Sequence, residues 1–132
     1  MDYVFDSNTI IHLMRGTKSI ESKVDEARKS NARFIIPYTV HYEITRGLLI
    51  KQIPKHIKVY DIICSNCSVE SITDEVWDKA AEIYADLYKK RFTVADADIL
   101  IAAFCIINRY TLVTDNTNDF LNISKLNYIN WL

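Results

Sequence analysis

The sequence predicts an α/β protein, a three-layer α/β/α sandwich around a parallel sheet of four or five strands. Short apolar runs alternate along the chain with longer segments of helical periodicity. Strands that helices separate at this interval form parallel βαβ units. The 132 residues contain only two glycines and two prolines, so no long flexible linker is expected. We therefore expect residues 1–132 to form a single domain.

The first half of the chain predicts two strands and three helices. It begins with a short buried strand, YVFD, which places Asp6 at its carboxyl end. A helix follows in SNTIIHLMRG, with Ser7 or Asn8 as its cap. We expect a second helix in SIESKVDEARKS and a second strand in RFIIP. The third helix, YTVHYEITRGLL, carries Glu43 in its first turns.

The second half predicts a helix in KHIKVYDIICSN, a third strand in CSVESI, a fourth in TLVTD and a short fifth in YINWL. Between the third and fourth strands lie two helices. The second, ADADILIAAFCIIN, is apolar almost all round, which indicates a buried helix. The first, TDEVWDKAAEIYADLYKKR, is amphipathic. Its apolar positions recur every three or four residues, at Val76, Trp77, Ala80, Ile83, Tyr84 and Leu87.

The composition is typical of an ordinary globular protein, with 49% hydrophobic and 25% charged residues. The net charge of -1 lacks the basic excess of many nucleic-acid binders, although Lys89, Lys90 and Arg91 form a local basic cluster. No apolar run is long enough to span a bilayer. The start MDYVFDSN is acidic, unlike a secretory signal. We expect a cytoplasmic protein with no membrane partner.

Acidic residues gather at one predicted edge of the sheet. Asp6 ends the first strand and Asp115 ends the fourth, while Glu43 and Asp96 lie near the starts of helices that leave the same edge. Two carboxylates about 5 Å apart, at an effective dielectric near 20, repel by roughly 3 kcal/mol. Mg²⁺ or Mn²⁺ would offset this repulsion and would also bind a substrate phosphate. The pattern favours a metal site.

Each acid also has a purely structural interpretation. Asp6 could form a turn and cap a helix, Glu43 could lie on the surface, and Asp119 could cap the next short turn. Asp96 is assigned mainly to capping the helix that contains Asp98. Independent caps, however, have no reason to gather at one sheet edge, which favours the metal site for the acids taken together.

Four segments, FDSNTII, YEITRGL, DADILIAAF and TLVTDNTNDF, run in this order from residue 5 to residue 120. Together they resemble the PIN-domain family of metal-dependent ribonucleases, and in particular its VapC-like toxins from toxin–antitoxin pairs. The resemblance implies a PIN-like fold. It matches Asp6, Glu43 and Asp98 to the three central acids, with Asp6 and Asp98 as metal ligands. Asp98 aligns because it directly precedes ILIAA, which leaves Asp96 as a cap or an assisting charge.

The fourth acidic position of the family falls on Asn116, between Asp115 and Asp119. The resemblance allows an acid or Asn there and makes Asp119 the favoured extra carboxylate. The chain departs from the family in the loop before the third acid, which reads KKRFTVA and lacks the glycine often seen there. This difference bears on the shape of that loop.

The resemblance implies that RNA is hydrolysed by in-line attack of a metal-activated water, leaving a 3'-hydroxyl and a 5'-phosphate. Glu43 would position or deprotonate that water. The resemblance also implies a homodimer and a cognate antitoxin that inserts residues into the acidic crevice. Side chains that could serve an antitoxin groove, although most have a simpler interpretation as core, are Ile10, Leu13, Leu48 and Leu49.

Other functions remain open at this point. A catalytically inactive PIN scaffold that binds a protein or RNA partner is the main alternative, and the intact acids count against it. A receiver would need paired acids after the first strand, and a nucleotide-binding module would need a GxxxxGK[ST] loop. A flap-type DNA nuclease would need insertions for duplex DNA. His12 and His41 lie near two acids, but the proposed hydrolysis does not require them.

Overall fold

The computed structural model describes residues 1–132 and confirms the predicted α/β architecture. Five parallel strands form one sheet in the order β3-β2-β1-β4-β5. The elements are β1 (Asp2–Phe5), α1 (Ser7–Met14), α2 (Lys18–Lys29), β2 (Arg33–Pro37), α3 (Tyr38–Lys51), α4 (Pro54–Ser65), β3 (Ser68–Glu70), α5 (Asp74–Lys89), α6 (Asp96–Asn108), β4 (Thr111–Val113), the 3-10 helix η1 (Thr117–Phe120) and β5 (Tyr128–Ile129).

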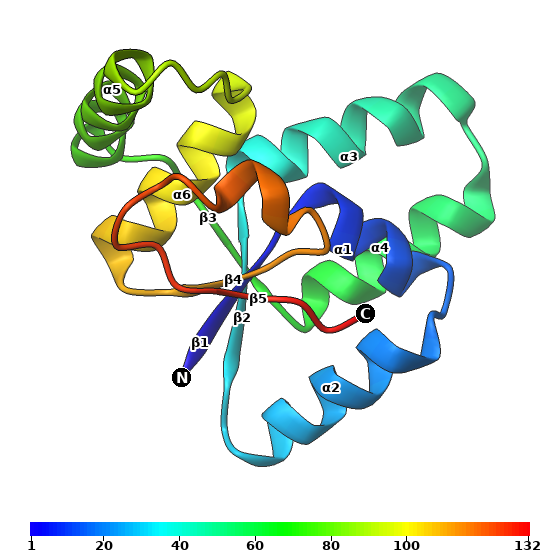
Figure 1. Ribbon diagram of the computed structural model, residues 1–132. Helices are drawn as coiled ribbons and strands as arrows, with labels where there is room; N and C mark the ends of the chain where they lie inside the picture. Colours follow the sequence, from blue (N-terminus) through cyan, green and yellow to red (C-terminus); the bar gives the residue numbers. More distant parts are fainter.

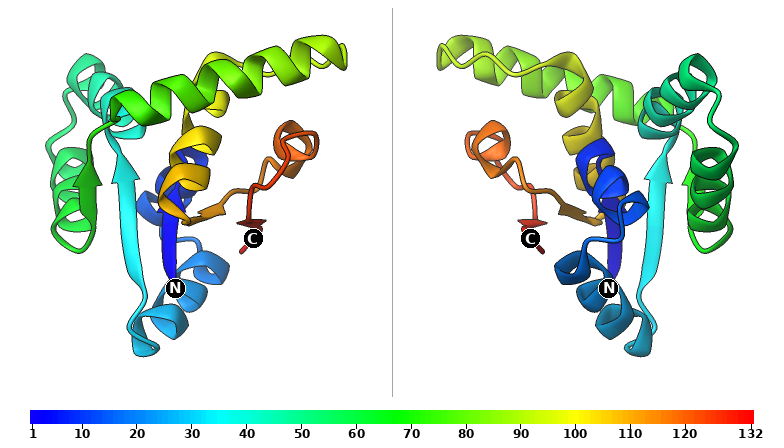
Figure 2. Two further views of the ribbon diagram at one scale, coloured as in Figure 1. Left: turned by 90° about the vertical axis from the view of Figure 1, so that its left-hand side faces the viewer. Right: turned by 90° about the vertical axis from the view of Figure 1, so that its right-hand side faces the viewer.

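Helices cover both faces of the sheet, as the three-layer prediction requires. Helices α1 to α4 lie on one side and α5 and α6 on the other (Figure 1). The chain moves outward from β1 to β3, crosses back to β4 through α5 and α6, and so reverses the strand order between β1 and β4. Figure 2 shows α5 lying across the top of the molecule. The reversal places the carboxyl ends of β1 and β4 side by side.

The central strands read as continuous apolar runs because both of their faces are covered. Val4 pairs with Ile35 on β2 and with Leu112 on β4, and all three side chains are fully buried. Phe104 of α6 belongs to the same single core cluster, which joins both helical layers to the sheet. No helix has both the length and the apolar character that crossing a membrane requires.

Two expected helix caps differ from those in the structure. The N-cap of α1 is Asp6, whose side chain accepts a hydrogen bond from the Thr9 N–H, and neither Ser7 nor Asn8 fills that position. The N-cap of α6 is Ala95, with no side-chain cap, so Asp96 is the first helical residue and does not cap the helix. In both cases the helix begins at least one residue earlier than the residue types suggested.

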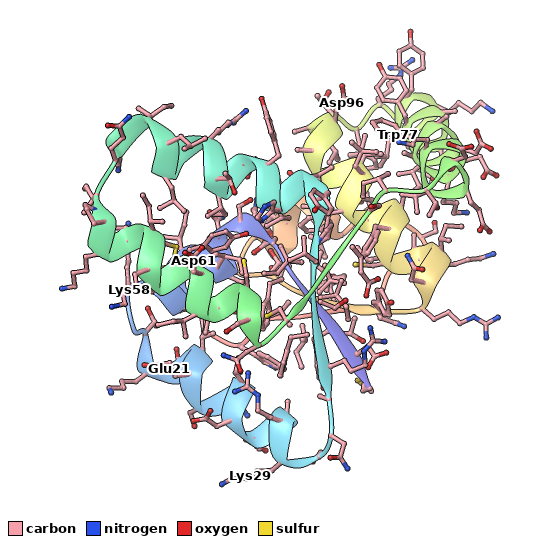
Figure 3. All side chains as sticks on the ribbon, turned by 180° about the vertical axis from the view of Figure 1, so that it is seen from behind. Glu21, Lys29, Lys58, Asp61, Trp77 and Asp96 are labelled. Carbon is pink, nitrogen blue, oxygen red and sulfur yellow. The ribbon has the colours of Figure 1, made fainter.

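The buried face of α5 is narrower than expected. Its core residues are Val76, Ala80, Ile83 and Leu87. Trp77, labelled in Figure 3, is 54% exposed, and Tyr84 is 53% exposed, so these two positions of the apolar pattern lie outside the buried face. Helix α5 packs mainly on α6, which covers a single stripe and leaves the neighbouring aromatic stripe open to solvent.

Replacing Phe104 by alanine is expected to lower the free energy of unfolding by about 3–5 kcal/mol, because the ring is 1% exposed in the core. Phe92, which is 44% exposed, provides the matched control, and Phe92→Ala should have a much smaller effect. Urea unfolding followed by circular dichroism measures both. Equal losses for the two variants would contradict the assignment of α6 to the core.

Candidate active site at the carboxyl edge of the sheet

Strands β1 and β4 pair side by side, with Phe5 opposite Val113. Asp6 and Thr114 therefore follow directly at one edge of the sheet. Helices α3 and α6 begin at the same edge and touch one another there (Figure 1). This is the strand-order reversal at which parallel α/β sheets bind ligands.

Asp6 is both a helix cap and a buried acid. Its side chain is 6% exposed, and its Oδ1 accepts the Thr9 N–H at 2.8 Å. The Thr9 hydroxyl donates to the Val113 carbonyl at 2.8 Å, which ties α1 to β4. Burial raises the pKa of Asp6, against the opposing effect of hydrogen bonds from Thr114 and Thr9. Burial thus disfavours the charged form of this carboxyl group, because its oxygens have few water contacts.

Glu43 lies in the second turn of α3, and the Ser7 hydroxyl donates a hydrogen bond to its Oε2. Ser7 directly follows Asp6, so this bond joins the ends of β1 and α3. The sequence interpretation gave Ser7 a capping role and missed this contact. Nothing in the sequence reveals it, because the two residues come together only when β1 and β2 pair.

Asp98 is half-buried in the first turn of α6. Burial is the main factor that raises its pKa to about 6, and the charges of Asp119, Asp6 and Glu43 raise it further. Asp98 therefore lies within electrostatic range of three other carboxylates. Asp96, labelled in Figure 3, is exposed at the tip of the same helix and is not among the charges that act on Asp98.

Three polar side chains in the segment after β4, those of Asp115, Asn116 and Asp119, make different contacts. Asp115 turns toward α1, where its Oδ2 lies 3.3 Å from His12 Nε2. The Asn116 N–H donates to the Thr114 hydroxyl at 3.0 Å, and the Asn116 side-chain amide donates to Asp119. The charge of Asp119 helps to raise the pKa of Asp98, whereas the charge of Asp115 helps to raise the pKa of Asp6. His41 is turned toward Tyr60, whose hydroxyl lies 2.8 Å from its Nδ1.

The donor set suits a hard divalent cation, although the side chains are not gathered around one point. No three His, Cys, Asp or Glu side chains are close enough to hold an ion as they stand. The reason is local, since Thr9 holds Asp6, Ser7 holds Glu43 and Asn116 holds Asp119. The charges of three neighbouring carboxylates, which help to raise the pKa of Asp98, are what Mg²⁺ or Mn²⁺ would neutralise.

Thr39 adds one more polar group, which the sequence interpretation also missed. Its hydroxyl oxygen is buried and has no hydrogen-bond partner. Thr39 lies four residues before Glu43 on α3, so the two side chains share a face of the helix. A buried hydroxyl without a partner is costly unless a ligand or water satisfies it, which is consistent with a polar ligand at this edge.

A partly apolar groove opens beside Glu43, between α1, α3 and α4. Its volume is about 310 Å³. Arg15, Lys51 and His56 contribute polar groups, and Glu43 is the acidic residue of its lining. The apolar lining residues are Ile11, Met14, Ile44, Leu48 and Ile53. Of the side chains suggested for such a groove, Leu48 lines it, whereas Ile10 is fully buried in the core.

Comparison with known proteins gives consistent similarities along the chain. Residues 3–126 match the PIN domain family. The ribonuclease VapC1 of Haemophilus influenzae (strain R2866) is 21% identical over 132 residues, which cover 99% of this chain and 98% of that protein. The ribonuclease VapC1 of Rickettsia felis is 48% identical over 46 residues, which cover 35% of this chain and 34% of that protein.

Solved structures share the fold. The structure of VapBC2 from Rickettsia felis bound to a promoter DNA fragment contains a chain with a TM-score of 0.91 and 24% identity, with 100% of both chains covered. VapBC-1 from nontypeable Haemophilus influenzae gives a TM-score of 0.84 at 22% identity, over 99% of this chain and 98% of that one. At these identities the likeness establishes the fold alone.

Asp98→Asn should stabilise the protein at neutral pH in metal-free buffer with EDTA. The pKa of Asp98 rises from 3.8 to about 6 on folding, so between these pH values the folded state binds more protons than the unfolded state. The contribution of Asp98 to stability therefore falls as pH rises through this window, and Asn removes that loss. Chemical unfolding at several pH values measures it.

The matched control is Asp96→Asn, two residues away and exposed, which should leave the pH dependence of stability as it is in the unsubstituted protein. The gain from Asp98→Asn should shrink as pH falls toward 4. A gain that is the same at every pH, or one shared by Asp96→Asn, would contradict the charge convergence at Asp98.

Proposed function

Because this chain belongs to the PIN-domain family, we propose that it is a metal-dependent endoribonuclease and the toxin of a toxin–antitoxin pair. The observation that carries the proposal is the convergence of Asp6, Glu43 and Asp119 on Asp98. The ribonuclease relatives and the toxin–antitoxin structures of the same fold support it. Residues 1–132 would act as one nuclease domain, and an RNA substrate implies action in the cytoplasm.

Asp6 and Asp98 would hold the metal, and Asp119 would complete the carboxylate set with Asn116 keeping it in place. Bound Mg²⁺ or Mn²⁺ would supply an activated water and neutralise charge on the phosphodiester. Glu43, held by Ser7, would orient the water and take its proton. The water oxygen attacks phosphorus in line, the bond to the 3' oxygen breaks, and the products carry a 3'-hydroxyl and a 5'-phosphate.

The groove beside Glu43 is the proposed binding site of the cognate antitoxin. Its apolar walls suit a segment with apolar side chains along one face, and Glu43 suits a basic side chain that reaches toward the acids. Arg15 and Lys51 would favour acidic residues on the flanks of that segment. An antitoxin segment bound in this groove would block access to the acidic edge and would thereby inhibit RNA cleavage.

The homodimer stays a prediction, and the exposed aromatic side chains of α5 are its proposed surface. Trp77 and Tyr84 are about half exposed, and Tyr88 is 73% exposed and stacks on Tyr84. Three large rings along one helix expose an apolar stripe of the kind that a second copy of the chain would cover. This stripe is separate from the groove between α1, α3 and α4.

Purified protein is expected to cleave a labelled RNA pool with Mg²⁺ or Mn²⁺ and to be inactive in EDTA. Asp98→Asn should lower the rate by roughly a hundredfold or more, because a proposed carboxylate ligand of the metal is lost. Asp96→Asn should keep most of the activity, since that side chain is exposed and caps nothing. Gel analysis of end-labelled products measures the rate and identifies the ends.

If the unsubstituted protein cleaves no RNA under any metal condition but still binds RNA or a partner protein, the inactive-scaffold alternative replaces the nuclease. If both aspartate variants lose activity equally, Asp98 has no special role among the acids. Retained cleavage in EDTA would remove the metal from the mechanism.

Gly47→Phe is expected to weaken the complex with the cognate antitoxin by at least about tenfold, as loss of a central contact does. Gly47 lines the groove, and a Cβ there meets no atom within 4 Å, so a side chain can be attached there without a clash at Cβ and would occupy part of the groove. Leu49→Phe, 65% exposed and outside the groove, is the control. Co-purification with the antitoxin and inhibition of RNA cleavage are the readouts. Equal inhibition of both variants would place the antitoxin elsewhere.

A further inference from the structure

The exposed face of α3 beside Glu43 carries two tyrosines and an arginine. Tyr38 is 51% exposed and Tyr42 is 63% exposed. The guanidinium of Arg46 lies over the ring of Tyr42, 5.2 Å from its centroid. Each residue lies one helical turn from the next, so the three side chains form a continuous surface, which we call the α3 shelf.

The α3 shelf begins at the acidic edge of the sheet. Tyr38 is the first residue of α3, directly after β2, and Tyr42 precedes Glu43 in the chain. Arg46 is three residues beyond Glu43, so its side chain lies on the helix surface between Tyr42 and Glu43. The exposed aliphatic residues of α3, Leu49 and Ile50, lie further along the helix, away from this edge.

The core holds the first ring of the shelf in place. Tyr38 packs edge-on against His41, with ring centroids 5.3 Å apart. His41 in turn is hydrogen-bonded to the hydroxyl of Tyr60, which is 2% exposed, and stacks on its ring. An exposed ring whose orientation is already fixed loses little conformational entropy when it binds a ligand.

Arg46 supplies a cation that no carboxylate neutralises. It takes part in none of the ion pairs of the structure. The chain has a net charge of -1 and gathers acids at this edge, so an RNA strand near Glu43 meets repulsion unless local groups offset it. Aromatic faces that stack with bases, together with an arginine for the phosphates, are the groups that bind single-stranded nucleic acid.

We propose that the α3 shelf binds single-stranded RNA next to the acidic edge, with bases stacking on Tyr38 and Tyr42 and a phosphate paired with Arg46. This inference rests on the proposed ribonuclease function and adds to it the strandedness of the substrate and the residues that hold it. Stacking is tolerant of base identity, so the shelf would position RNA without selecting its sequence. Duplex RNA, whose bases are already stacked, would not fit it.

The test uses full-length protein with Asp98→Asn in every variant, so that RNA is bound and not cut. Fluorescence anisotropy with a short labelled single-stranded RNA should show binding weakened about tenfold by Tyr42→Ala, while Tyr42→Phe stays within about twofold. Ile62→Ala on α4, whose side chain is 57% exposed and lies outside the α3 shelf, the antitoxin groove and the aromatic stripe of α5, is the control and should bind normally. A 2-aminopurine base in the RNA should be quenched by binding, and less so with Tyr42→Ala.

Arg46→Ala should reduce the dependence of binding on salt by about 0.7 in the log–log slope, which corresponds to one phosphate contact. The shelf is overturned if Tyr42→Ala binds like the parent protein, if Tyr42→Phe loses as much as Tyr42→Ala, or if duplex RNA competes as well as single strands. It is also overturned if sedimentation shows that Tyr42→Ala separates two protein copies and RNA binding is unaltered.

Failure of the nuclease proposal gives a different result. Protein with Asp98 intact that binds single-stranded RNA through the α3 shelf, yet cleaves none with Mg²⁺ or Mn²⁺, would retain the shelf and reject the catalytic role of the acids. Protein that cleaves RNA normally after Tyr38→Ala and Tyr42→Ala would reject the shelf and retain the nuclease.

Discussion

The side-by-side pairing of β1 and β4 is the constraint on which the rest of the site depends. It places the end of β1, with Asp6 and Ser7, against the polar loop that follows β4, and it brings the first turns of α3 and α6 to the same edge. The resulting repulsion among carboxylates opposes folding. Separate hydrogen bonds from Thr9, Ser7 and Asn116 hold Asp6, Glu43 and Asp119 in place.

The sequence was sufficient for much of this arrangement. Alternating apolar runs and helical segments predicted all five strands, whereas the order of the strands in the sheet comes from the structure. The buried nature of α6 followed from its apolar residues on every side. These features are local or repeat along the chain, so they can be read without knowing which elements touch.

Other features depend on contacts between distant residues, and the sequence did not reveal them. Trp77 and Tyr84 fit the apolar spacing of α5, but only one neighbouring helix covers that helix, so they remain exposed. The contact between Ser7 and Glu43 spans 36 positions. The family resemblance separated Asp98 from Asp96 by position alone, and the physical difference, an exposed acid against one that feels three other charges, comes from the geometry of the first turn of α6.

The double use of Asp6 has an evolutionary consequence. Because its carboxylate caps α1, replacing it with an apolar residue would weaken the fold as well as any chemistry at the edge. A descendant of this chain that had lost its activity would therefore still be under selection to keep Asp or Asn at that position. In such a descendant, substitutions are expected first at Glu43 and Asp98, because no helix cap depends on either side chain.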